Sequence, residues 1–195
     1  KADFDQAISM DPKNYDRLIE IYEALAAHGY REVGQEYLQN VLDTAKQLDA
    51  YDSGRIYYYL GEYQKAYLAL DEARDKGGAD SYLYLGRAYA ATGDYNYASS
   101  VYNNYLSKQG PNAEIYNELG LCEMAKKEYQ NALAAFQAGK QIEGNSLMQT
   151  LCFNEIVAYE YLEDYQQAEV LMNAYLQNYP DDQAAIREQQ FLSTR

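Results

Sequence analysis

Tyrosine is the residue type in this sequence that could serve the largest number of chemical roles. The stretch SGRIYYYLGEYQKAY, residues 53–67, has five tyrosines between Tyr57 and Tyr67, and the whole chain has 24 Tyr, 4 Phe and no Trp. A phenol can bind a partner, take part in a redox relay, or pack in a core while its hydroxyl reaches a hydrogen-bond acceptor. A relay needs a metal or radical partner, and the sequence offers no candidate for one. Packing and binding are therefore the two roles to separate.

The other reactive side chains do not form a catalytic group. His28 stands before a glycine at the end of a predicted helix, where an imidazole interacts with the last carbonyls. Cys122 and Cys152 lie in apolar helical stretches without zinc-site spacing, so we expect buried free thiols, with a disulfide as the alternative. GRAYAATG, residues 86–93, lacks the lysine of a phosphate loop, and Asp181-Asp182 is typical of a helix cap. We therefore predict no enzyme activity, no metal site and no cofactor.

The charge of the chain limits its partners. It has 16 Lys and Arg against 30 Asp and Glu, a formal net charge of −14. Nucleic acid and anionic membrane surfaces are therefore poor partners, because both need a basic face. No apolar run approaches the roughly 18 residues of a membrane span, so we predict no membrane insertion by this segment. A basic or apolar protein or peptide is the expected partner.

Four copies of one pattern supply the elements that must position these side chains. The copies begin at residues 47, 79, 113 and 149, and their shared tyrosine recurs at intervals of 32, 34 and 36 residues. The aligned columns are Gly54, Gly86, Gly120 and Ile156; Tyr57, Tyr89, Glu123 and Tyr159; Tyr63, Tyr95, Tyr129 and Tyr165; Ala66, Ala98, Ala132 and Ala168; and Leu70, Tyr102, Phe136 and Met172. A period of this length is typical of a helical repeat array.

Each copy is predicted to form two helices. YLYLGRAYAATG ends at Gly93, a helix stop, and Asp94 is an N-cap for YNYASSVYNNYLSKQ, which stops at Gly110-Pro111. The glycine and alanine columns let the two helices approach closely, and the large side chains fill the space beside them. We expect the tyrosines of the repeat-defining columns to be core residues: Tyr57, Tyr63, Tyr89, Tyr95, Tyr102, Tyr129, Tyr159 and Tyr165.

The pattern resembles the tetratricopeptide repeat family, whose motif is W-x2-L-G-x2-Y, then A-x3-F, then P. In the second copy Leu85-Gly86-x2-Tyr89, Ala98-x3-Tyr102 and Pro111 match, with Tyr82 in the place of the Trp. Glu123 departs from the aromatic column and Ile156 from the glycine column. The resemblance implies an all-α fold: a right-handed α-solenoid of stacked antiparallel helical hairpins.

The predicted organisation is a single solenoid over residues 1–195. Within it we expect a remnant of an upstream repeat, a degenerate repeat, four regular repeats and a terminal capping helix, so that the sequence begins inside a repeat. The boundaries are 1–14 for the remnant, 15–46 for the degenerate repeat, 47–78, 79–112, 113–148 and 149–182 for the repeats, and 183–195 for the capping helix.

The resemblance also implies a partner site, because the first helix of each repeat lines a concave groove in this family. Carried over position by position, the groove residues are Tyr51, Arg55, Tyr58, Tyr59, Leu83, Tyr84, Arg87, Asn117, Leu121, Phe153, Val157 and Tyr161. Tyrosine and arginine often carry interface energy, although the alternative is that these side chains pack on neighbouring repeats. Arg55 and Arg87 share one column and could receive a partner's carboxylate or form salt bridges within the chain. The basic and asparagine clamp that holds chaperone tails in some family members is not reproduced.

Three functions follow from this sequence. The first is a protein–protein interaction scaffold that binds a partner peptide or helix in its groove. The alternatives are a regulatory or sensor segment of a larger protein whose effector part lies elsewhere, and a self-associating structural array. The sequence leaves the oligomeric state open. It leans to an extracytoplasmic or membrane-anchored bacterial protein with the anchor outside this chain, because acidic, tyrosine-rich, lysine-poor arrays of this look also occur in exported bacterial proteins; a cytoplasmic protein is the alternative.

Overall fold

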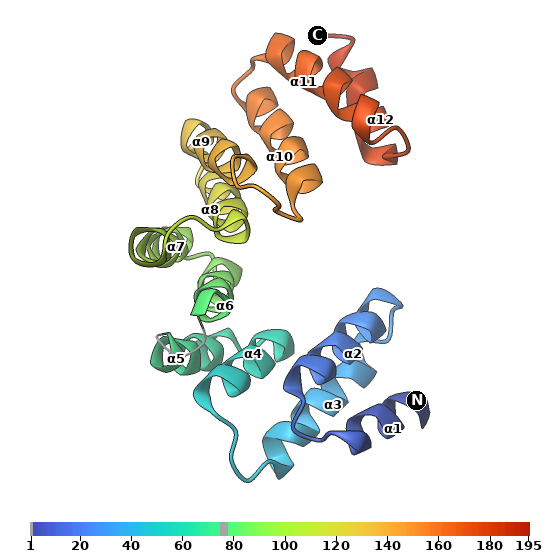
Figure 1. Ribbon diagram of the computed structural model, residues 1–195, viewed down its shortest axis with the longest axis vertical. Helices are drawn as coiled ribbons and strands as arrows, with labels where there is room; N and C mark the ends of the chain where they lie inside the picture. Colours follow the sequence, from blue (N-terminus) through green and yellow to red (C-terminus); the bar gives the residue numbers. More distant parts are fainter. Residues whose placement is uncertain (1, 75–77) are drawn as a thin grey trace. The chain divides into compact units, whose positions relative to one another are not determined.

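A computed structural model describes residues 2–74 and 78–195, and every regular element in these ranges is an α-helix (Figure 1). The helices are α1 (Ala2–Met10), α2 (Tyr15–Ala27), α3 (Arg31–Thr44), α4 (Ala50–Leu60), α5 (Tyr63–Ala73), α6 (Gly78–Ala91), α7 (Tyr95–Gln109), α8 (Ala113–Ala125), α9 (Tyr129–Lys140), α10 (Met148–Tyr161), α11 (Tyr165–Asn178) and α12 (Gln183–Leu192). None of these described helices is both long and apolar enough to cross a bilayer. The predicted all-α class is confirmed.

The chain divides into two compact units, Lys1–Ala88 and Tyr89–Arg195, which we call unit 1 and unit 2. In unit 1, α2 packs on α3 and α4 packs on α5. In unit 2, α8 packs on α9 and α10 packs on α11, with α12 against α11. Each of these pairs is an antiparallel hairpin closed by a short turn, as the repeat pattern predicts. The predicted repeat boundaries within a single solenoid stay a prediction.

One turn geometry recurs at five places along the described chain. Its left-handed residue is glycine in the first three turns and a residue with a side chain in the last two: Gly29 (φ 83°), Gly61 (φ 80°), Gly93 (φ 85°), Lys127 (φ 65°) and Glu163 (φ 60°). The next backbone N–H donates to a carbonyl five residues back, as in Tyr30 to Leu25, 2.8 Å, and Asp164 to Tyr159, 3.0 Å. This bond satisfies a carbonyl that the helix end would leave unpaired. The predicted stop at Gly93 is confirmed.

Short polar side chains begin several of the helices. The Asp94 carboxylate accepts a hydrogen bond from the Tyr97 N–H at 3.1 Å, and Asn112 and Asp164 do the same for α8 and α11. Asp182 accepts from the N–H groups of Ala184 and Ala185, so the predicted capping role of this acidic pair is confirmed at its second residue. Such caps satisfy the free N–H groups of the first turn.

The glycine column exists because a large side chain occupies the space where a Cβ would stand. A Cβ on Gly54 would lie 2.5 Å from Leu70 Cγ, and one on Gly120 would lie 2.3 Å from Phe136 Cε1. Leu70 and Phe136 are fully buried. The helices of these two hairpins therefore approach as closely as they do only while the first helix carries no side chain at that point.

The fourth copy solves the same packing problem with different residues. Ile156 occupies the glycine column, and its counterpart on α11 is Met172, an unbranched and adaptable side chain. Both are buried in one core cluster, with exposed fractions of 1% and 0%. The departure predicted from the motif at Ile156 thus does not open a gap between α10 and α11.

The hairpin of α2 and α3 reverses the arrangement. Thirty-two residues before Gly54 stands Tyr22, and the same interval before Ala66 reaches Gly34. A Cβ on Gly34 would lie 2.9 Å from Tyr22 Cδ2, so the ring packs directly on the glycine backbone. The small residue has moved from the first helix to the second, and Tyr22 joins Leu18, Leu38 and Ile56 in the core of unit 1.

The tyrosines of the repeat-defining columns are less deeply buried than expected. Tyr102 is fully buried, whereas the other seven rings are only partly covered. A two-layer array is thin, so a ring that begins in the core reaches the surface with its hydroxyl. At Glu123, where the column loses its ring, the buried carboxylate accepts from Ser99 Oγ at 2.8 Å and pairs with Lys126 Nζ at 2.7 Å. Glu123, the predicted departure from the aromatic column, therefore replaces a packed ring by a hydrogen bond to the preceding helix α7.

We predict that Gly120→Ala lowers the free energy of unfolding by about 1–3 kcal/mol, because the new methyl group overlaps the Phe136 ring. Chemical denaturation of the purified chain measures the change. Adding Phe136→Met, which replaces the ring by the methionine of the fourth repeat, should restore part of the loss. The double variant should then lose less unfolding free energy than the two single variants lose together. Additive losses would contradict the direct contact.

We predict that Lys127→Gly raises the free energy of unfolding by about 0.5–1 kcal/mol, because a side chain at positive φ is strained and glycine relieves it. The matched control is Asn131→Gly, an exposed position inside α9, where glycine should lower stability instead. Equal effects of the two substitutions would show that the turn stores no strain.

Candidate functional site

The twelve residues predicted for the partner site fall into two sets. Seven belong to unit 1, on α4 and α6, and five belong to unit 2, on α8 and α10. Each set is described within its own unit. In both sets some side chains face solvent and others are core residues, so exposure separates those that are available to a partner from those that are not.

Arg55 is a core residue of unit 1 and not an open receptor for a carboxylate. Its guanidinium forms salt bridges at 2.5 Å with Asp16 on α2 and with Asp52 on α4, and it lies 4.3 Å from the centre of the Tyr51 ring. Only 6% of the residue is exposed. Of the two roles left open by the sequence, the structure has the internal salt bridge, which joins the first helices of two successive hairpins.

Leu83 and Asn117 are also buried, with exposed fractions of 3% and 7%. Leu83 is one of several buried residues of α6, with Tyr82 and Leu85. The buried face of this helix is wide and includes Leu83. Asn117 accepts a hydrogen bond from Asn154 Nδ2 at 2.9 Å, which ties α8 to α10. In this structure these two side chains, like Arg55, pack within the chain and present little surface to a partner.

Five tyrosines of unit 1 form a contiguous group that we call the tyrosine cluster: Tyr22, Tyr58, Tyr59, Tyr63 and Tyr84. Ring centres are 5.1 Å apart for Tyr22 and Tyr59, 5.6 Å for Tyr58 and Tyr84, and 5.9 Å for Tyr58 and Tyr63. The cluster draws on α2, α4, α5 and α6, and all its rings except Tyr22 are partly exposed. Its edge-to-face pairs hold the rings in fixed positions.

Hydroxyl groups of the cluster are engaged in hydrogen bonds. The Tyr59 hydroxyl donates to Glu23 Oε1 at 2.6 Å and lies 3.1 Å from the Tyr84 hydroxyl. Burial raises the pKa of Tyr59, and the bond to the Glu23 carboxylate raises it further. A phenol in this state stays neutral and donates hydrogen bonds, so the cluster is suited to packing and recognition.

Three of the five predicted residues in unit 2 line a cavity of about 460 Å³, which we call the α10–α12 cavity. Four residues of α10, three of them predicted, line it together with the first residue of α11 and two residues of α12. The lining residues are Phe153, Val157, Glu160, Tyr161, Tyr165, Glu188 and Phe191. Tyr161 is the most exposed of the predicted residues at 57%, and its ring stacks on Tyr129 with 5.0 Å between centres. Leu121, on α8, is 43% exposed.

Two carboxyl groups face each other in this cavity. Burial raises the pKa of Glu160 to about 7, and the charge of Glu188 and a hydrogen bond between the two side chains raise it as well. The second carboxyl oxygen of Glu160, Oε1, is buried, and no group in the described part of the chain donates to it. One proton held by Glu160 therefore relieves the repulsion between the two groups near neutral pH.

Four of the residues that line the cavity were not predicted as site residues from the sequence. They are Glu160, Tyr165, Glu188 and Phe191. A signal existed for the first, because Phe153, Val157 and Glu160 follow the i, i+4, i+7 spacing of one helix face. Glu188 and Phe191 share a face of α12 at i, i+3. The last helix was predicted only to cap the array, so its own exposed face was not considered.

Other reactive residues have structural roles. His28 Nδ1 lies 2.8 Å from the Ala24 carbonyl oxygen, which confirms the predicted contact at the helix end. Cys122 and Cys152 are free thiols, the first buried and the second partly buried, and burial raises the pKa of both, that of Cys122 to about 12. Thiols that stay protonated are poor nucleophiles. Within the described ranges, no three His, Cys, Asp or Glu side chains gather as metal ligands do.

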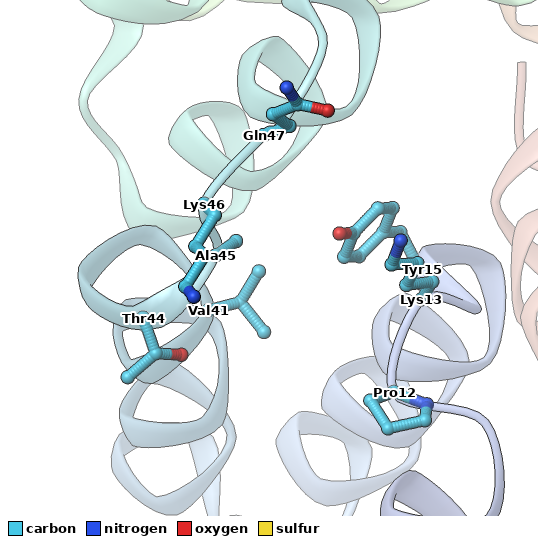
Figure 2. Close-up of a pocket in the computed structure, with 8 residues that line it drawn as sticks. All are labelled: Pro12, Lys13, Tyr15, Val41, Thr44, Ala45, Lys46 and Gln47. Carbon is cyan, nitrogen blue, oxygen red and sulfur yellow. The ribbon is translucent and has the colours of Figure 1, made fainter.

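A second cavity, of about 540 Å³, lies in unit 1 between the turn before α2 and the segment after α3. Figure 2 shows Tyr15 on one side of this space and Val41 and Ala45 on the other. Two lysines, Lys13 and Lys46, stand at its edges. None of the twelve predicted residues lines this cavity.

Comparison with known proteins identifies the repeat. The family model described as "Tetratricopeptide repeat" matches residues 51–98 and 85–145. Residues 51–145 of this chain are tetratricopeptide repeats. The matched residues span the first three regular repeats predicted from the sequence. No curated protein sequence matches this one.

Solved structures of the tetratricopeptide repeat fold are similar to this protein. A chain of the APC/C hetero-tetramer Cut9–Hcn1 has a TM-score of 0.67 at 17% identity over 98% of this chain and 38% of its own length. A thermophilic TPR protein of Thermus thermophilus has a TM-score of 0.70 at 16% identity over 93% of this chain and 100% of its own. YrrB, described as a TPR protein with an unusual peptide-binding site, has a TM-score of 0.62 at 18% identity over 96% and 97%. At these identities the likeness shows the fold, which is generally a non-enzymatic scaffold for protein–protein interaction.

We predict that the stability of this protein falls as pH rises from about 4.5 to about 7, through the contribution of Glu160. In that window the folded chain holds a proton on Glu160 that the unfolded chain releases, so folding is favoured at the lower pH. Thermal melts across the window should show a smaller decrease for Glu160→Gln, which stays neutral. Parallel profiles for the two proteins would mean that the carboxyl group titrates normally.

Proposed function

We propose that this protein is an interaction scaffold that binds a segment of a partner protein against the first helices of its repeats. The observation that carries the proposal is the α10–α12 cavity, which is lined by Phe153, Val157 and Tyr161, three residues that the family resemblance assigns to the groove. Large side chains at the surface of a cavity leave apolar area in contact with water, and a bound partner removes it.

The tyrosine cluster of unit 1 supports the same proposal. Tyr58, Tyr59 and Tyr84 present partly exposed rings whose positions are fixed by one another. Rigid aromatic side chains bind with a small loss of conformational entropy, because they have few rotatable bonds to order. Their hydroxyl groups add hydrogen bonding for the backbone of an extended or helical segment.

The composition of these surfaces favours recognition over catalysis. The side chains available at them are aromatic, aliphatic and carboxylic, and the two thiols and the histidine lie elsewhere. The net charge of −14 favours a partner segment that is basic or apolar. We therefore propose a protein or peptide partner and no substrate turnover.

We predict that Leu121→Ala with Tyr161→Ala weakens partner binding at least tenfold, about 1.4 kcal/mol, while the melting temperature changes little, because both side chains are well exposed. The partner is first captured by crosslinking to the full chain, and the dissociation constant is then measured by calorimetry.

The matched control is Leu68→Ala with Val170→Ala. These side chains are 69% and 58% exposed but lie on α5 and α11, the second helices of their hairpins. The control should bind the partner as the unmodified chain does. If the two double variants lose affinity alike, the first helices do not form the binding surface.

A further inference from the structure

The α10–α12 cavity has an unusual combination of groups: two carboxyl groups among four aromatic rings. None of the seven residues that line it is basic. We propose that this cavity is the subsite for a cationic side chain, arginine or lysine, of the partner protein. The proposal rests on the proposed scaffold function and adds the chemistry of the segment that is bound.

The rings that line the cavity are already in contact with a cation of the chain itself. The guanidinium of Arg195 lies 4.4 Å from the centre of the Phe191 ring and 5.8 Å from that of Tyr165. These distances are within the range of cation–π attraction, which arises from the negative face of the ring. Phe191 and Tyr165 lie 6.4 Å apart in a T-shaped pair, so an entering cation meets both the face of one ring and the neighbouring ring.

The carboxyl pair provides the charge that the cation requires. Glu160 comes from α10 and Glu188 from α12, and the two side chains converge on one space. Because both residues line the cavity, their carboxyl groups can accept hydrogen bonds from a guanidinium or ammonium donor that enters it. A bound cation replaces the shared proton in keeping the two carboxylates together.

The dimensions of the site suit a side chain and not a large ligand. Its volume of about 460 Å³ lies near the lower end of the range for small-ligand sites, about 300–1,000 Å³. Val157 and Phe153 line the cavity beside the carboxyl groups and can pack against the methylene stem of lysine or arginine. Long basic side chains bury their stems and keep the charged end beside an acceptor, which is the arrangement available here.

The occupant is a basic partner and not a second copy of this chain. Each copy carries a net charge of −14, so two copies repel each other at this acidic surface. A partner segment that carries positive charge is attracted to it, and a neutral apolar segment would leave the carboxyl pair without a counter-charge.

The test uses the full chain and three capped pentapeptides of the form Gly-Gly-X-Gly-Gly, with arginine, lysine or citrulline at X. Citrulline has nearly the shape of arginine but no charge. Binding is followed by nuclear magnetic resonance titration with phenylalanine and tyrosine ring labels, so that shifts of Phe191 and Tyr161 report the cavity. The titration is repeated with Arg195→Gln, because the Arg195 guanidinium competes for the same rings.

The expected result is saturable binding of the arginine and lysine peptides with shifts at these rings, at least tenfold tighter than binding of the citrulline peptide. Glu160→Gln with Glu188→Gln should abolish that preference. The control Glu163→Gln with Glu169→Gln removes the same charge at exposed positions nearby and should keep it.

Two outcomes would overturn the proposal. One is no shift with either basic peptide in both the chain and the Arg195→Gln variant. The other is equal loss of affinity in the two glutamine variants, which would indicate a diffuse effect of net charge. A failure here with retained partner binding by the unmodified chain would leave the scaffold function standing and reject only the cationic subsite.

Discussion

In three hairpins, α2–α3, α4–α5 and α8–α9, the close approach of the two helices depends on one contact between a glycine and a large buried side chain opposite. Gly54 against Leu70 and Gly120 against Phe136 show how tight the contact is, since an added Cβ would overlap the partner. Because both members lie in the core, neither can change alone without a clash or a cavity. The same contact fixes how far the first helix rotates, and so which of its residues remain at the surface. Leu121, which follows Gly120 on α8, is one residue that remains exposed.

The turns add a second constraint that acts on the backbone. Five turns between helices contain a residue at positive φ, and two of these turns use Lys127 and Glu163 instead of glycine. The surrounding hydrogen bonds, including the one from Glu128 N–H to the Glu123 carbonyl at 2.9 Å, hold these residues in a conformation that their side chains disfavour. Local geometry is thus dictated by the packing of the hairpin more than by the preference of the residue in the turn.

Much of this architecture could be predicted from the sequence, because the same pattern of small and large residues recurs in each copy of the repeat. Periodic columns locate the paired helices, and Gly93 and Asp94 mark a turn that the structure contains. The site was harder to predict, because a register position says which helix face a residue is on but not what covers that face. Arg55 shares its column with Arg87, yet it is buried by a salt bridge to Asp16, thirty-nine residues earlier in the chain. Glu188 and Phe191 contribute to the cavity from a helix outside the repeat columns, where no alignment between copies could reveal them.

The reversed pair in the α2–α3 hairpin has a consequence for how such arrays diverge. With Tyr22 on the first helix and Gly34 on the second, the interface keeps one bulky and one minimal partner, although each has changed places. What is preserved is the contact between one glycine and one large side chain, a feature that no single column of an alignment records. The family model begins its match at residue 51, after this hairpin. In this chain the helical hairpins therefore extend beyond the residues that the family model matches.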